Sequence, residues 1–73
     1  MKKHAKQALE RAEAMGLVCS ITVGPKGHYK LHATKGNVSL DVPVSGTPTD
    51  QDACVNMVAQ MLRRRFAERG VSL

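Results

Sequence analysis

The apolar residues of this chain change their spacing twice, and this change limits the folds that it can adopt. Over residues 4–15 they recur every three or four positions, which indicates a helix with one apolar stripe. Over residues 17–44 they alternate with polar residues in three short runs, the pattern of strands covered on one face. From about residue 50 to about Arg69 the helical spacing returns. The pattern therefore predicts the element order α-β-β-β-α.

The sequence also marks the ends of the two predicted helices. Gly16 and Gly70 follow the apolar stripes, at the position where a left-handed residue commonly ends a helix. Either Thr47 or Thr49 is expected to cap the second helix, and Asp50 favours its positive end. The stripe residues are Ala5, Ala8, Leu9, Ala12 and Met15 in the first helix, and Cys54, Val55, Val58, Met61, Leu62 and Phe66 in the second.

The three alternating runs predict an antiparallel meander over residues 17–23, 28–33 and 38–44. The segments 24–27 and 34–37 have the composition of the turns that join these strands. One face of the sheet is apolar, and we expect the two helices to cover it. The other face is polar and should meet solvent or a ligand; it carries Ser20, Thr22, His28, Lys30, His32, Ser39 and Asp41.

A chain of 73 residues allows one domain, which we expect to span residues 1–73. The expected architecture is a two-layer α+β domain with a three-stranded antiparallel sheet and both helices on one face. No apolar run has the length of a membrane span, and the first lysines are not followed by the apolar segment of a signal peptide. We therefore expect a cytoplasmic protein without a membrane partner, in which Cys19 and Cys54 are reduced.

The chain is basic, with 11 Lys and Arg against 6 Asp and Glu and a formal net charge of +5. This charge favours a polyanionic partner, nucleic acid first, although a generic solvated surface gives the same count. Tyr29 and Phe66 are the only aromatic residues, which argues against binding by successive base stacking. Arg63, Arg64 and Arg65 could face a phosphate, but steps of about 100° spread them around a helix, so a solvated face is the favoured interpretation.

Most catalytic and metal-binding patterns are absent from the sequence. Because there is no Gly-rich phosphate loop, Gly-x-Ser-x-Gly elbow or Cys-x-x-Cys pair, we expect no cofactor and no metal ion. The pattern that remains is His28-x-Lys30-x-His32 on one exposed strand face. An imidazole can exchange a proton near neutral pH, and an ammonium group can hold a phosphate. The group therefore suits RNA cleavage by the substrate's own 2′-hydroxyl, which needs no metal.

The spacing of the two histidines limits their roles. His28 and His32 are separated by about 13 Å along a strand, too far for both to act on one phosphate or to share one ion. One would be catalytic, and the other would contact the RNA backbone. The alternative interpretation is a solvated strand face whose two histidines have no chemical role.

The stretch from Gly24 to Leu31 reads Gly-Pro-Lys-Gly-His-Tyr-Lys-Leu and resembles the signature of the HicA-type toxins, approximately Gly-Lys-Gly-Ser-His-His-x-Phe. A later Val-Pro segment of that family is similar to Val42-Pro43-Val44, and the second predicted helix follows it. The resemblance covers residues from about 5 to 66. Small phage-encoded relatives are similar through Gly-x-His-x-Lys-Leu and a Thr-Pro-Thr-Asp helix start. The family has histidines where this chain has Tyr29 and Ser45.

The HicA-type toxins are small mRNA interferases of toxin–antitoxin systems with a double-stranded-RNA-binding-like (dsRBD-like) fold. The resemblance implies that fold and an endoribonuclease activity for this chain. His28 matches the catalytic histidine of the family. Lys26, Lys30 and Lys35 would bind RNA phosphates, and His32 would assist them. The implied partners are RNA and a HicB-type antitoxin that covers the active face.

Two other classes of function stay open on the residues alone. One is a nucleic-acid-binding module without catalysis, whose affinity comes from phosphate contacts. The other is a protein-interaction domain, for example a homodimer. Because Pro43 cannot donate a ladder hydrogen bond, it should lie at a strand end or on an edge strand, and an exposed edge favours association. The small core and the four methionines also favour association.

Overall fold

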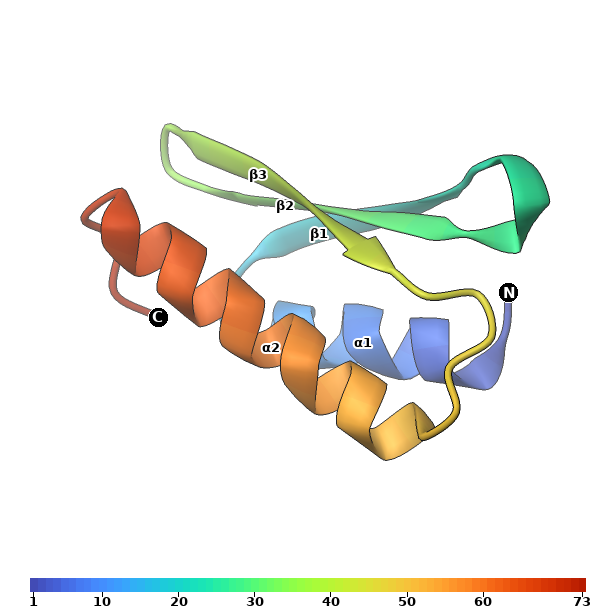
Figure 1. Cartoon of the computed structure of the whole chain (residues 1–73). Helices are drawn as coiled ribbons and strands as arrows, with labels where there is room; N and C mark the ends of the chain where they lie inside the picture. The colour runs from blue at the N-terminus through green and yellow to red at the C-terminus, as the bar shows by residue number, and fades with distance from the viewer.

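The computed structural model describes residues 1–73 as a two-layer α+β domain (Figure 1). The helices are α1 (Lys3–Ala14) and α2 (Gln51–Glu68), and the strands are β1 (Val18–Val23), β2 (Tyr29–Lys35) and β3 (Val38–Val44). A short 3-10 helix, η1 (Pro25–Gly27), forms the turn between β1 and β2. This order confirms the predicted α-β-β-β-α arrangement.

The three strands form one antiparallel sheet in the order β1-β2-β3, so β2 is central and β1 and β3 are the edges. Pro43 therefore lies on an edge strand, as expected. The register places side chains in rows across the sheet. Two of these rows are Ser20–His32–Asp41 and Thr22–Lys30–Pro43.

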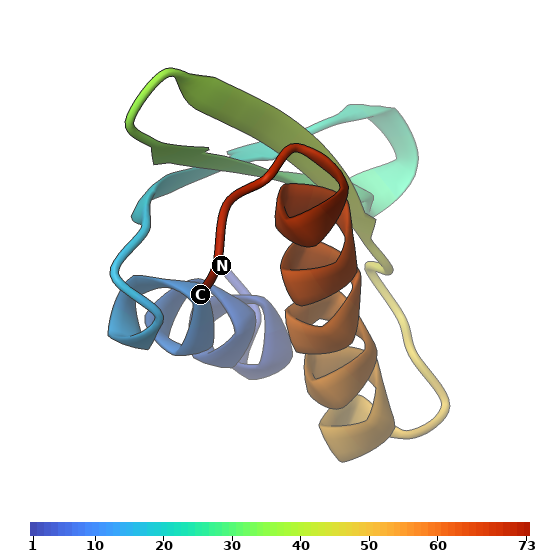
Figure 2. The same cartoon turned by 90° about the vertical axis from the view of Figure 1, so that its left-hand side faces the viewer.

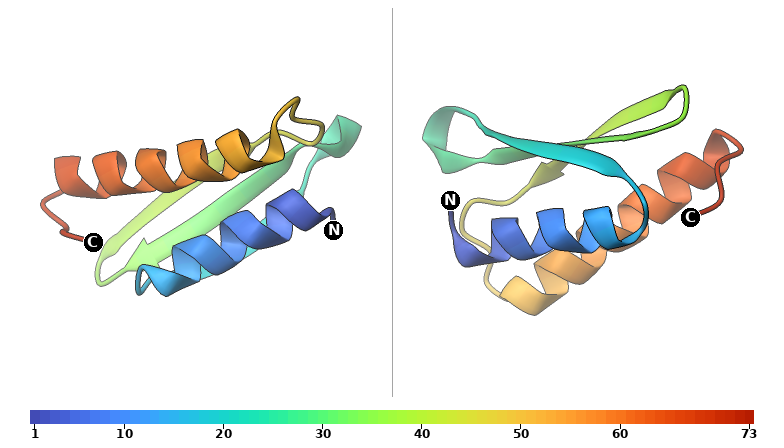
Figure 3. Two further views of the ribbon diagram at one scale, coloured as in Figure 1. Left: turned by 90° about the horizontal axis from the view of Figure 1, so that it is seen from below. Right: turned by 180° about the vertical axis from the view of Figure 1, so that it is seen from behind.

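Both helices cover the same face of the sheet and leave the opposite face open (Figures 2 and 3). α1 lies beneath β1, and α2 packs against β3 and α1. The core between the layers consists of Ala5, Ala8, Ala12, Leu17, Tyr29, Leu31, Ala33, Val42, Val44, Cys54, Val58, Leu62 and Phe66. The small alanine side chains of α1 allow the helix to approach the other elements closely. Neither helix combines the length and the apolar character needed to cross a membrane.

Both helices end at the predicted glycines. Gly16 has φ of +86° and Gly70 has φ of +77°, the left-handed region that glycine adopts without a Cβ penalty. At the end of α2 the Gly70 amide donates to Ala67 O at 2.9 Å, and the Val71 amide donates to Phe66 O at 2.8 Å. These two bonds form a Schellman motif, which satisfies carbonyls left unpaired by the helix end.

The cap of α2 corrects the sequence prediction. The N-cap is Asp50, whose carboxylate accepts a hydrogen bond from the Ala53 amide at 3.0 Å. The prediction of Thr47 or Thr49 as the cap is wrong, because the helix begins only at Gln51. An aspartate at this position accepts a hydrogen bond from an amide that the helix leaves unpaired, and it places negative charge at the positive helix end.

The strands also differ from their predicted bounds. β2 includes Thr34 and Lys35, so the turn to β3 is only Gly36-Asn37 instead of the predicted four residues. Gly36 has φ of +60°, which suits the first position of a two-residue hairpin turn. At its other end β2 begins at Tyr29, which leaves His28 as the last residue of the preceding turn.

Candidate nucleic-acid interface

The open face of the sheet carries the polar side chains that the sequence assigned to it. Along β2 the residues Tyr29, Leu31 and Ala33 are buried against the helices, whereas Lys30 is exposed and His32 is half-buried on the opposite side. This alternation confirms the predicted division of β2 into a core face and a polar face. No helix covers the polar face (Figure 1).

A depression of about 550 Å³ lies on the open face near the β1–β2 turn. It brings together the two histidines and one lysine that the sequence singled out. Its lining residues are Thr22, Gly24, Pro25, His28, Tyr29, Lys30, His32 and Pro43. A depression of this size can hold a nucleotide-sized group.

His28 has an exposed side chain that makes no hydrogen bond within the protein. Its backbone is fixed, because His28 O accepts a hydrogen bond from the Gly24 amide at 2.7 Å and closes the turn. The backbone of His28 is therefore held in place, whereas no hydrogen bond holds its ring and both ring nitrogens are free for an incoming group. No carboxylate contacts the ring to set its orientation.

A corner of packed residues supports His28 from the helix side of the sheet. The ring of buried Tyr29 meets the ring of His4 edge-on at a centroid distance of 6.0 Å, and its hydroxyl accepts from the Lys2 amide at 3.1 Å. His4 is 1% exposed, and its Nε2 donates to Ser45 O at 2.6 Å. A Cβ added to Gly46 would lie 2.1 Å from the carbonyl oxygen of Gly27, so these two backbones touch.

Sequence reasoning missed His4. Its Nδ1 is buried without a partner once Nε2 donates to Ser45. A signal was present in the spacing, because His4 precedes Ala8 by four residues and Ala12 by eight, which places it on the buried stripe of α1.

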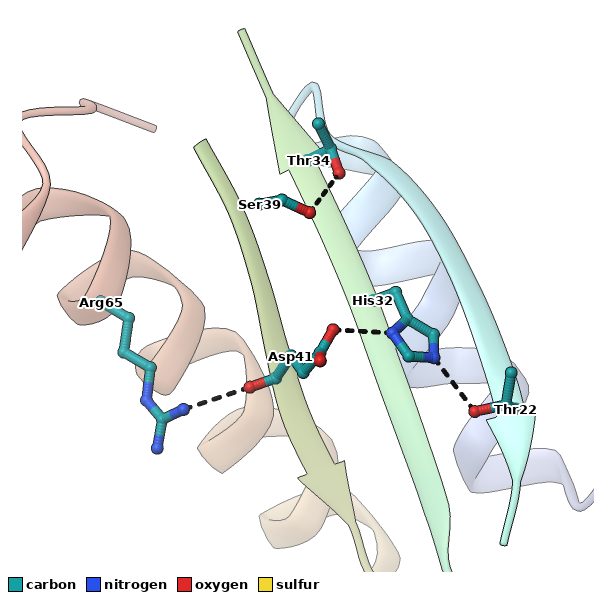
Figure 4. A network of polar contacts seen from close by, with 6 residues as sticks. All are labelled: Thr22, His32, Thr34, Ser39, Asp41 and Arg65. Atoms are coloured by element: carbon teal, nitrogen blue, oxygen red, sulfur yellow. Dashed lines mark hydrogen bonds and ion pairs between the residues drawn. The ribbon is translucent and has the colours of Figure 1, made fainter. Parts of the chain in front are cut away.

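His32 differs from His28 in that both of its ring nitrogens are engaged (Figure 4). Nδ1 lies 2.6 Å from Asp41 Oδ1, and Nε2 lies 3.0 Å from Thr22 Oγ1. A carboxylate can only accept, so Nδ1 donates to Asp41. In the neutral ring Nε2 then carries the lone pair and accepts from the Thr22 hydroxyl.

The backbone beneath this network is tied to α2. Arg65 Nη1 donates to the main-chain oxygen of Asp41 at 3.2 Å, so α2 holds the strand that presents the carboxylate (Figure 4). Farther along the same face the hydroxyls of Thr34 and Ser39 lie 3.0 Å apart. Asp41 is the only acidic residue on the three strands.

The lysines assigned to RNA binding do not all lie at the depression. Lys30 lines it. Lys26 is exposed at the tip of the turn, where its φ is +63°. Lys35 lies at the far end of β2, about 23 Å from His28 along the strand, and its Nζ donates to Ser72 O at 3.2 Å. The structure therefore groups Lys30 with His28 at the depression, leaves Lys26 on the neighbouring turn outside the lining, and separates Lys35 from both.

The three consecutive arginines of α2 do not converge on one point. Arg63 and Arg64 are exposed, whereas Arg65 is half-buried and bonded to Asp41 O. The exposure of Arg63 and Arg64 agrees with the favoured interpretation of a solvated helix face, whereas Arg65 departs from it. On α2 a second hollow of about 360 Å³ is lined by Met57, Gln60, Met61 and Arg64, and it contains no group with acid–base or nucleophilic chemistry near neutral pH.

Both cysteines are free. Burial raises the pKa of the Cys19 thiol, and the negative charge of Glu13 raises this pKa further, so the thiol is a poor nucleophile near neutral pH. No group of three His, Cys, Asp or Glu side chains is placed to hold a metal ion.

Comparisons of the chain with protein-family models, with curated proteins and with solved structures gave no significant match. A functional assignment therefore rests on the geometry of the open face.

Proposed function

We propose that this protein is a HicA-like RNA-binding protein that cleaves RNA without a metal ion, with His28 as the general acid or base. The observation that carries this proposal is the free imidazole of His28, which borders the same depression as the Lys30 side chain on an open sheet face. The α-β-β-β-α order with both helices on one face is compatible with the dsRBD-like fold that the family resemblance implies.

The chemistry needs only groups of the depression, of the neighbouring turn and of the RNA. The 2′-hydroxyl of the RNA attacks the adjacent phosphorus as it loses its proton, and the 5′-oxygen of the next nucleotide leaves as it gains one. His28 takes or gives one of these protons, and water exchanges the other. Lys26 and Lys30 neutralise the charge that grows on the phosphate oxygens. The products are a 2′,3′-cyclic phosphate and a free 5′-hydroxyl.

The remaining assigned residues would contact the strand away from the reacting phosphate. Both ring nitrogens of His32 are engaged by Thr22 and Asp41, so in this mechanism its ring would lie beside the RNA backbone and would not exchange a proton with it. Lys35 would contact an RNA strand that runs along the whole length of β2. An RNA-directed activity of this kind places the protein in the cytoplasm, with a HicB-type antitoxin as the partner that covers the open face.

The experiment compares the purified protein with its His28→Ala variant on mixed RNA in the presence of EDTA. We expect the variant to cleave at least about 100-fold more slowly because it has lost an acid–base group. A Gln60→Ala variant, changed at an exposed position of α2, controls for contaminating nuclease and for handling. If His28→Ala cleaves at the rate of the unmodified protein, His28 is not catalytic.

A second function is favoured by one specific observation, the lack of any group that orients the His28 ring. Catalytic imidazoles are usually held by a carboxylate or carbonyl on the second nitrogen. Without such a group, the same lysines would bind RNA and release it uncleaved. This module would bind with a steep salt dependence, and Lys30→Ala would lower the slope of log K against log salt by about 0.7–0.9.

The two functions are separated by measuring binding and cleavage on the same RNA. Salt-dependent binding with no cleavage supports the binding module. Binding with cleavage that depends on His28 supports the interferase. Binding that is absent or insensitive to salt contradicts both.

A homodimer remains a third proposal, and the two sheet edges differ in how well they suit it. The β3 edge suits pairing less well, because Pro43 has no amide to donate and the Asp41 carbonyl already accepts a hydrogen bond from Arg65. The β1 edge carries two exposed valines, Val18 and Val23. Light scattering over a wide range of concentrations tests this proposal, because a dimer requires a mass that rises with concentration.

A further inference from the structure

We propose that Thr22, His32 and Asp41 form a second reactive site, in which the Thr22 hydroxyl attacks small carboxylic esters. This activity does not depend on the proposed RNA cleavage, because it uses neither the His28 imidazole nor an RNA hydroxyl. The observation behind it is the line of two contacts that joins a hydroxyl, an imidazole and a carboxylate (Figure 4).

The connectivity matches the roles of a nucleophile, a base and a group that orients the base. The Asp41 carboxylate accepts from Nδ1 at 2.6 Å, which fixes the ring and leaves the lone pair on Nε2. Nε2 lies 3.0 Å from Thr22 Oγ1, within reach for removing the hydroxyl proton. The three groups come from β1, β2 and β3: Asp41 lies directly opposite His32 in the register, and Thr22 lies diagonally from it, two residues beyond the direct partner Ser20.

The surroundings provide space and positive charge for a substrate. Thr22 and His32 line the depression of about 550 Å³, which can take a small acyl group. Lys30 lines it too and is the direct cross-strand partner of Thr22, and such partners have Cβ atoms about 5 Å apart. We assign to Lys30 the role of stabilising the negative charge that develops on the carbonyl oxygen of an ester bound in the depression.

The reaction balances with an ester and water as the only reactants. Thr22 Oγ1 adds to the carbonyl carbon while His32 Nε2 takes the hydroxyl proton. The intermediate then expels the alcohol, which receives that proton, and acyl-Thr22 remains. Water adds to the acyl carbon and gives a proton to Nε2; the carboxylic acid leaves as the proton returns to Thr22 Oγ1. One ester and one water become one acid and one alcohol.

Arg65 serves this site as a positioning residue. Its bond to the Asp41 carbonyl ties α2 to the strand that carries the carboxylate, and it does not touch the reacting atoms. The network therefore extends from α2 through β3 and β2 to β1. An exposed hydroxyl–histidine pair without this support would be free to adopt many geometries.

The test uses p-nitrophenyl acetate with full-length His28→Ala protein, which lacks the unpartnered imidazole that would react with this ester by itself. Release of p-nitrophenolate is followed, and mass spectrometry locates the acetyl group. Thr22→Val removes the hydroxyl but keeps the branched shape; we expect at least about a tenfold slower release and no acetyl group at residue 22. Thr34→Val is the matched control, because it removes a hydroxyl from the same face outside the site.

Two further variants test the roles of the other groups. Asp41→Asn should slow the acylation at least about tenfold, because the imidazole loses the carboxylate that orients it and stabilises its protonated form. Thr22→Ser should restore acylation of residue 22, since it retains a hydroxyl. Far-ultraviolet circular dichroism checks that each variant is folded.

The proposal is overturned if Thr22→Val releases p-nitrophenolate as fast as Thr34→Val, or if the acetyl group is found only on lysines and the amino terminus. Its failure is distinguishable from failure of the RNA proposal. The loss of RNA cleavage in His28→Ala concerns His28 alone, whereas acetyl-Thr22 is measured in protein that already lacks His28.

Discussion

His28 and His32 project from the same side of the sheet, yet the protein holds them in different ways. The His28 end of the open face is supported from the helix side of the sheet. There the chain start packs against Tyr29 and the β3–α2 loop, and that loop also touches the backbone of η1. The His32 end is held on the open face itself by side chains of the neighbouring strands. One end therefore offers a free imidazole on a turn that packs against the chain start and the β3–α2 loop, and the other offers an imidazole whose direction is set.

Of the changes that test this contrast, a substitution at Gly46, in the corner beneath His28, should have the largest effect on stability. We expect Gly46→Ala to lower the free energy of unfolding by about 2–3 kcal/mol, because its Cβ would lie 2.1 Å from Gly27 O. Thermal unfolding should show a midpoint lower by about 10 °C or more. Gly24→Ala is the matched control: its Cβ would lie 3.5 Å from His28 O, an ordinary contact. If both variants unfold at the same temperature, the corner does not support the turn.

A smaller effect is expected at the other histidine. We expect His32→Ala to lower the free energy of unfolding by about 1 kcal/mol, because it removes two hydrogen bonds that lie close to solvent. A double-mutant cycle with Asp41→Ala, followed by urea denaturation, should give a coupling energy of about 0.5–1 kcal/mol. A coupling of zero would mean that the Asp41 contact does not hold the ring.

The smallest effect on stability is expected at His28. His28→Ala should change the free energy of unfolding by less than about 0.5 kcal/mol, because the exposed ring makes no hydrogen bond within the protein. Urea denaturation of this variant beside His32→Ala measures the contrast directly. Equal losses in the two variants would contradict the distinction between a free and a held imidazole.

The sequence predicted the element order and the division of β2 into two faces, because both follow from periodicity within single segments. It could not predict the Thr22–His32–Asp41 line, which depends on register. The four-residue turn expected over 34–37 would place Ser39 opposite His32, whereas the observed Gly36-Asn37 turn places Asp41 there. A shift of two residues keeps every side chain on its face, so the alternation carries no information about it.

The corner beneath His28 was missed for a related reason. Its contacts join residues distant in the chain, such as His4 with Ser45 and Lys2 with Gly46, and no local pattern connects such pairs. The prediction of a threonine cap failed for a simpler reason: Asp50, to which only a favourable charge was assigned, stands beside Thr49 and is as good a capping residue as either threonine.

The bond from Lys2 Nζ to Gly46 O, at 2.7 Å, has a practical consequence for handling the molecule. It makes the first residues part of the floor under the His28 turn, whereas Ser72 lies at the opposite end of the sheet beside Lys35. A purification tag joined before Met1 would start beneath the His28 turn, on the helix side of the sheet, and would disturb the contacts of Lys2 with Gly46 and Tyr29. A tag joined after Leu73 would leave these contacts undisturbed.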